Sequence, residues 1–197
     1  FVVAAISYDK FMSFENSKDQ TGFTIKYRED PIFLDPRHKL LGGRIVINLE
    51  KLYMSLKKLQ LKSENPDEYY NFSFNLGIPQ KNMDKLKNKL FGIECNFNEL
   101  NGIDFKKGCY VGQENTARIQ LKNKQSKRLL PIKLIKGKLK EGSIIYCNNN
   151  EIGKVLIGDG YMFGLIKYKS EYFDIESELK SDEAILKVQQ PGWLKLN

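Results

Sequence analysis

One short segment, KGCYVGQE at 107–114, gathers the residue types in this sequence that could do chemistry. Cys109 follows Lys106 and Lys107 and stands between two glycines, which allow backbone conformations and close approaches that larger residues would block. The pattern over 113–119 predicts a helix. A thiol at the entry to a helix and beside two ammonium groups has two reasons for a lowered pKa. The segment therefore predicts a reactive thiolate, and the alternative is an inert buried cysteine.

The cysteines and the single histidine do not form the pattern of a metal site. Cys95, Cys109 and Cys147 make no C-x-x-C pair, and His38 is the only histidine. Neither a zinc site nor a disulfide framework is therefore expected. An iron–sulphur cluster held by one chain usually needs four thiolates. We expect no intrinsic metal, and a protein of this kind would assist clusters rather than store them.

The net charge of +8 comes from 27 Lys and only 5 Arg. This balance is not typical of a surface that grips phosphates bidentately, so a nucleic-acid partner is not favoured. The densest stretch, 122–140, carries eight cations and no acid. Solvated lysines on strand faces explain it, and contact with a polyanion or an acidic partner is the alternative. Since no run approaches about eighteen uncharged apolar residues, we expect no membrane helix and a soluble, intracellular protein.

The elements that position the Cys109 segment fall into two groups. Before it, the pattern predicts two helices over 49–61 and from about 65 to Gly77, and a shorter helix over 84–90. Residue pairs typical of turns occur at 30–31, 35–36 and 42–43. Strands are expected at FVVAAISY, TIKYREDPIFLDP and GGRIVINL.

After the segment, short alternating stretches predict a small antiparallel barrel or sandwich. The expected strands are RLLPIKL, GSIIYC, EIGKVLIG, YMFGLIKY and AILKVQQ. Their start places the domain boundary near 123–126, which gives a region over 1–125 and a β-barrel domain over 126–197. The fold class expected from this order is α+β.

The motif KGCYVGQE, with Arg118 four residues after Glu114, resembles the signature K-G-C-[FY]-x-G-Q-E-x-x-x-R of the YgfZ-type folate-binding family, which shares its fold with the glycine-cleavage T-protein. The resemblance covers nearly all of the chain. The supporting pieces are LDPR at 34–37 with Gly42 and Arg44, LGIP at 76–79 with Asp84, Glu94, Asn96, Leu100, Asn101 to Ile103 and Phe105, and Lys127-Arg128-Leu129.

This resemblance implies an aminomethyltransferase-like mixed α/β region followed by the β-barrel, with tetrahydrofolate in a central opening. Cys109 would be the functional thiol. Glu94 and Asn96 would belong to the folate site, since a carboxylate can accept two hydrogen bonds from an aminopyrimidine edge. Arg37 and Arg44 could orient a folate glutamate tail or a carboxylate of a partner, and a structural role at a turn is the alternative. The loop that presents the thiol would be built by Lys107, Gly108, Tyr110, Gly112, Gln113, Glu114 and Arg118.

The function implied is that of a folate-binding accessory factor for the maturation or repair of four-iron cluster proteins, without a defined turnover of its own. The alternative is a tetrahydrofolate-dependent aminomethyl transferase of the T-protein type. A nucleic-acid contact through 122–140 is a third, weaker hypothesis. Expected partners are folate and iron–sulphur assembly factors or client enzymes, and a monomer is expected.

The location implied is the cytoplasm in a bacterium and the mitochondrial matrix in a eukaryote. The chain starts with Phe1 and enters directly into an expected strand. About one hundred residues with which relatives begin have no counterpart here, so an amino-terminal truncation is expected.

Overall fold

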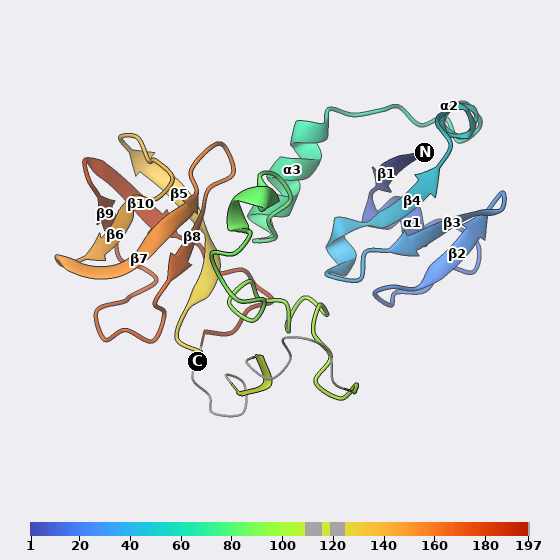
Figure 1. Ribbon diagram of the computed structural model, residues 1–197. Helices are drawn as coiled ribbons and strands as arrows, with labels where there is room; N and C mark the ends of the chain where they lie inside the picture. Colours follow the sequence, from blue (N-terminus) through green and yellow to red (C-terminus); the bar gives the residue numbers. More distant parts are fainter. Residues whose placement is uncertain (109–115, 119–124, 197) are drawn as a thin grey trace. The chain divides into compact units, whose positions relative to one another are not determined.

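The computed structural model describes residues 1–108, 116–118 and 125–196 (Figure 1). The chain divides into two compact units. The first comprises 1–65 and 100–102, and the second comprises 66–99 and 103–197. The predicted domain boundary near 125 falls inside the second unit and stays a prediction.

The first unit is built on an antiparallel sheet with the strand order β1-β4-β3-β2. Phe11 from α1 and alternate residues of the strands form its core, among them Ile32, Leu34, Ile45 and Ile47. This alternation is what a sheet with one covered face requires. The elements are β1 Val2–Ile6, α1 Tyr8–Met12, β2 Thr24–Tyr27, β3 Asp30–Leu34, η1 Lys39–Leu41, β4 Gly43–Ile47 and α2 Leu49–Lys58.

The turn between β2 and β3 lies two residues earlier than the turn predicted at 30–31. Arg28 and Glu29 both have positive φ, 50° and 73°, as a two-residue hairpin loop requires. Pro31 instead lies within β3, opposite Lys26. The pairing of β3 with β4 begins only at Ile32, so the N–H that proline lacks is not needed by that neighbour.

The predicted helices are present with shorter bounds. The side chain of Asn48 caps α2, which ends at Lys58 rather than 61. In the second unit, α3 Pro66–Asn75 is followed by Gly77 with a φ of +75°. The helix predicted over 84–90 is the 3-10 turn η2, Met83–Leu86. None of the described helices combines the length and hydropathy needed to cross a membrane.

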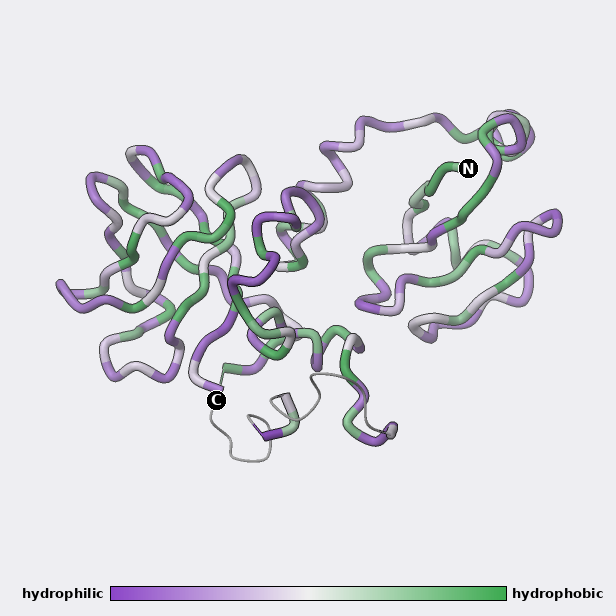
Figure 2. The backbone as a smooth tube through the Cα atoms, in the orientation of Figure 1, coloured by the Kyte–Doolittle hydropathy of each residue, from purple (hydrophilic) through white to green (hydrophobic). Residues whose placement is uncertain are grey.

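The second unit contains the predicted barrel, closed in the order β10-β5-β8-β7-β6-β9. Hydrophobic and hydrophilic stretches alternate along its strands (Figure 2). Its interior holds Leu130, Ile132, Val155, Ile166 and Leu186, all fully buried. The strands are β5 Arg128–Lys136, β6 Ile144–Cys147, β7 Asn150–Ile157, β8 Phe163–Ile166, β9 Leu179–Ser181 and β10 Ala184–Val188.

Candidate functional site

The segment that contains Cys109 lies largely outside the described residues. Cys109 is outside them, and so are four residues of its predicted scaffold: Tyr110, Gly112, Gln113 and Glu114. Of the predicted scaffold, Lys107, Gly108 and Arg118 are described, and all three are exposed. Arg118 belongs to the helical residues 116–118. The geometry of the thiol therefore stays a prediction. The structure does describe the residues that precede and follow the segment.

Hydrogen bonds join the chain before the Cys109 segment to the chain after it. The backbone N–H of Leu129 donates to the carbonyl of Glu94 at 2.8 Å. The side-chain amide of Gln125 donates to the carbonyl of Ile93 at 2.7 Å. The hydroxyl of Tyr168 donates to the Gln125 carbonyl at 3.0 Å. Residues 93–94 and 125–129 are thus held side by side, and the intervening chain starts and ends at one place.

We call the contact between residues 93–99 and 125–129 the junction, and Asn96 is its buried centre. Only 2% of its surface is exposed, and its φ of 62° lies in the left-handed region that asparagine tolerates. Its Nδ2 donates to the carbonyl of Leu129 at 2.8 Å, and its Oδ1 accepts from Nη1 of Arg128 at 3.2 Å. Both polar ends of the side chain are therefore used within the protein. These contacts give Asn96 a structural task, and the assignment to folate stays a prediction.

Arg128 continues the network through an ion pair. Its Nη2 lies 2.7 Å from Oε1 of Glu99, and its guanidinium lies over the ring of Tyr168 at 5.9 Å. The arginine is only 7% exposed. A buried guanidinium needs such partners, because its desolvation is costly. Arg128 therefore joins β5 to the residues just before the Cys109 segment.

Glu94 is half-buried and partly engaged. Its Oε2 accepts from the backbone N–H of Phe91 at 2.9 Å, which closes its own turn. Within the described part of the chain its Oε1 has no hydrogen-bond partner, so this carboxylate keeps acceptor capacity for a ligand.

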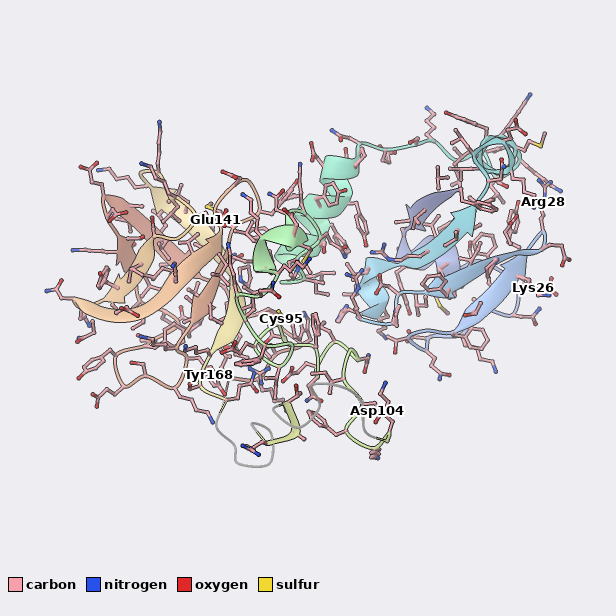
Figure 3. All side chains as sticks on the ribbon, in the orientation of Figure 1. Lys26, Arg28, Cys95, Asp104, Glu141 and Tyr168 are labelled. Carbon is pink, nitrogen blue, oxygen red and sulfur yellow. The ribbon has the colours of Figure 1, made fainter. Side chains whose placement is uncertain are left out.

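The neighbouring Cys95 is buried. Its burial, and to a smaller extent the nearby charge of Glu94, raises the pKa of its thiol to about 12. Cys95 is accordingly protonated and unreactive at neutral pH. Figure 3 labels Cys95 and Tyr168.

Arg37 and Arg44 meet in the first unit on a common partner, Asp35. Arg37 donates from Nε to Oδ1 at 3.0 Å and from Nη2 to Oδ2 at 2.7 Å, and the Nε of Arg44 donates to Oδ2 at 2.5 Å. The carboxylate is fully buried. Burial would raise its pKa, but the hydrogen bonds from the two arginines outweigh it and hold the pKa below the ordinary value. The alternative structural role at a turn thus has direct contacts to support it.

Arg128, Glu99, Gln125 and Tyr168 were not among the residues predicted for the site. Arg128 belongs to the cationic stretch 122–140, for which solvated side chains on strand faces are the expected explanation, and to the Lys127-Arg128-Leu129 piece of the resemblance. Its place directly before a run of buried strand residues was the available signal. Glu99, Gln125 and Tyr168 stand in stretches whose local pattern predicts nothing about long-range contacts.

A metal site is not evident among the described residues, where no three His, Cys, Asp or Glu side chains are grouped closely enough to hold an ion.

Comparison with known proteins tests the kinship inferred from the motif. The chain is 34% identical over 102 residues to the mitochondrial iron–sulfur cluster assembly factor IBA57 homolog of Dictyostelium discoideum, which covers 51% of this chain and 25% of that protein. It is 38% identical over 97 residues to the homolog of Neurospora crassa, over 49% of this chain and 22% of that protein. The chain is a relative of these assembly factors. The predicted resemblance is confirmed.

The mouse factor of the same name is 31% identical over 126 residues, which are 60% of this chain and 35% of that protein. The chain thus spans well under half the length of these curated relatives. No family model matches it.

The fold has a counterpart in the crystal structure of glycine cleavage system aminomethyltransferase T from Bartonella henselae. The TM-score is 0.57 at 13% sequence identity, over 89% of this chain and 53% of that chain. The predicted T-protein-like fold with a closed barrel is therefore confirmed.

Proposed function

We propose that this chain is part of an accessory factor for iron–sulphur cluster assembly, with Cys109 as its functional thiol. The observation that carries the proposal is the similarity to relatives from a slime mould, a filamentous fungus and a mammal, all of which bear the name of iron–sulfur cluster assembly factor. The motif KGCYVGQE supports the choice of residue, since Cys95 and Cys147 are buried.

The buried junction supports a presented thiol. Asn96 and Arg128 tie residues 96–99 to 128–129, on either side of the Cys109 segment, and polar side chains satisfied in this way are costly to separate. A segment fixed at both ends loses less conformational entropy when it engages a partner or a cluster than a free segment does. The joined flanks would therefore reduce the ordering cost when Cys109 acts on a target.

Tetrahydrofolate binding is the finer part of the proposal. Glu94 fits the task, because one carboxylate oxygen retains acceptor capacity next to a short buried segment. Asn96, Arg37 and Arg44 already bind partners of their own, so they fit it less well. When bound, folate would supply one-carbon chemistry. Glu94 would hold and orient its aminopyrimidine edge.

The partners proposed are iron–sulphur assembly factors or client enzymes, and the location proposed is mitochondrial. Both follow from the names of the relatives, which are mitochondrial assembly factors.

The test of the assembly role is a gene deletion followed by complementation with the complete gene. The proposal predicts that deletion lowers the activity of an enzyme that carries a four-iron cluster and that the gene restores it. An enzyme of the same compartment without a cluster serves as the matched control. Equal loss of both activities, or loss of neither, would contradict the assembly role.

The aminomethyl transferase alternative has the fold of the Bartonella henselae protein in its favour, and the fold alone. It predicts that the complete gene product forms methylene-tetrahydrofolate from an aminomethyl donor in a folate-dependent reaction. The assembly proposal predicts no such product above the rate without protein.

A further inference from the structure

Four lysines from three barrel strands share one exposed face. Lys133 and Lys136 belong to β5, Lys187 to β10 and Lys180 to β9. These strands are neighbours in the barrel, in the order β9-β10-β5. Lys180 and Lys187 are each flanked by buried residues, and Lys133 follows the buried Ile132. Lys133 pairs with Lys187, and Lys136 pairs with Ile185 two residues before Lys187, so all four lysines point away from the barrel interior. We call this group the lysine face, and two of its members lie outside the cationic stretch 122–140.

The strand register places like charges directly opposite each other on this face. Lys133 pairs with Lys187 across the β5 and β10 ladder. Lys136 and Lys180 both pair with Ile185, one from each side. Like charges at opposed positions of antiparallel strands destabilise the pair. The fold alone therefore gives no reason to collect these four cations.

Acidic side chains do not neutralise the lysine face within the described residues. Elsewhere in the second unit, lysines do find carboxylates: Lys89, which follows η2, lies 2.6 Å from Glu141, and Lys167 lies 2.7 Å from Glu151. The nearest acids in the sequence to the face are Glu178, Asp182 and Glu183, and none is within ion-pair distance of its lysines. The positive charge of the face is thus left for solvent or for a partner.

Apolar groups lie among these cations. Ile185 is half-buried between Lys136 and Lys180, and Ile135 of β5 is 49% exposed. Tyr146 of β6 pairs with Lys180 and is 38% exposed. Charged and apolar side chains are thus interleaved, and such a mixture is common in protein interfaces. It is not typical of a phosphate-binding surface, which relies on arginine forks and on stacking aromatic rings.

We propose that the lysine face is a docking surface for an acidic protein partner that also offers apolar side chains. Charge complementarity sets the partner class, and Ile135, Ile185 and Tyr146 give the apolar contact. The face lies on the barrel and does not include the Cys109 segment. The docking proposal is therefore independent of the proposed assembly function, and either can fail alone.

The experiment measures binding of a fluorescein-labelled peptide that alternates aspartate with leucine, by fluorescence anisotropy. The complete protein is compared with K133E/K187E, which reverses the opposed pair. The matched control is K57E/K58E on α2, because these lysines are exposed and make no ion pair among the described residues. Both variants change the net charge by the same amount, and circular dichroism checks that both fold.

The proposal predicts binding that weakens at least about tenfold in K133E/K187E and stays close to wild type in K57E/K58E. Raising the salt from about 0.1 M to about 1 M should also weaken it, because the screening length falls from about 10 Å to about 3 Å. A K133Q/K187Q variant should fall between wild type and K133E/K187E.

Three results would overturn the proposal. The first is an equal loss in both charge-reversal variants, which would mean attraction to net charge alone. The second is no peptide binding at low salt. The third is tighter binding of a single-stranded oligoribonucleotide of equal formal charge, lost in K133E/K187E, which would assign the face to nucleic acid.

Discussion

Each of the two units contains a buried ionic cluster, and the two clusters are built in opposite ways. In the first unit a fully buried carboxylate, Asp35, receives hydrogen bonds from two arginines that still reach solvent. In the second unit a buried guanidinium, Arg128, is shared between the carboxylate of Glu99 and the amide of Asn96. One cluster surrounds a single anion with two cations, and the other surrounds a single cation with one anion and a neutral amide.

The difference indicates what each cluster does. The Asp35 cluster joins neighbours in sequence, because 35, 37 and 44 enclose only the turn before β4. The Arg128 cluster joins residues that are about thirty positions apart and lie on either side of the Cys109 segment. The first therefore stabilises a local corner of a sheet, and the second joins the chain before the segment to which we assign the chemistry to the chain after it.

The largest effect is expected from Asp35→Asn. It leaves two arginines beside a buried neutral group, and breaking a buried pair in this way costs about 3 kcal/mol, at the low end of its range because both arginines reach solvent. Hydrogen exchange should show lost protection in β3 and β4 and little change in β5 and β8. Asp19→Asn, which breaks an exposed pair with Lys39, is the control and should shift stability far less. Equal effects in the two variants would contradict the account.

A smaller effect is expected from Arg128→Met, about 2 kcal/mol, since Glu99 loses its partner but is itself partly exposed. Fluorescence of Trp193, the only tryptophan, reports unfolding of this unit through its contact with the carbonyl of Leu76. Adding Glu99→Gln should recover about 1 kcal/mol, because the pair is coupled. If the double variant is no more stable than Arg128→Met, the ion pair is not what holds the junction.

The pH dependence separates the clusters further. Because the folded pKa of Asp35 is lowered, its contribution to stability is present above its ordinary pKa of about 3.9 and is lost as the pH falls through the folded value. Urea midpoints of the first unit should therefore fall below about pH 4 in the wild type and fall less steeply in Asp35→Asn.

His38 contributes at higher pH. Burial, then the charge of Lys39, lowers its pKa, so its neutral form is favoured in the folded state. Its stabilising contribution is present above about pH 6.5 and is lost as the pH falls further. A His38→Asn variant should remove this step and leave the Asp35 step unchanged. Loss of both steps in His38→Asn would contradict the assignment.

The smallest perturbation is chemical labelling of the thiols, which leaves the fold intact. Brief treatment with iodoacetamide near pH 8, read out by peptide mass spectrometry, should modify Cys109 well before Cys95, whose pKa is raised to about 12 by burial. Cys147 is buried in the barrel and should also be protected. Labelling of Cys95 at the rate of Cys109 would contradict the picture of one presented thiol.

The barrel was predictable because its strands alternate with clear turns, as at Asn148 and Asn149, whose positive φ values of 46° and 66° suit a hairpin. β9 was missed because three residues, Leu179–Ser181, are too few to show a period. The turn at 28–29 was missed because Arg28 and Glu29 are not typical turn residues and Asp30-Pro31 is the stronger signal.

For the site, the sequence was enough to predict the motif and its resemblance to a family, but not the contacts between residues 93–99 and 125–129. Arg128 and Glu99 lie far apart in sequence, and the residue pattern of a strand does not reveal which cation is buried. The lysine face was hidden for the same reason, since Lys180 and Lys187 reach it only through strand pairing.

The most direct test of the account replaces Cys109 by Ala in the complete gene and measures the activity of a four-iron-cluster enzyme in the deletion strain. Cys95→Ala is the matched control, because it removes a buried thiol from the same unit. The account predicts that Cys109→Ala fails to restore the activity and that Cys95→Ala restores it, at equal protein levels. Full restoration by Cys109→Ala would contradict it.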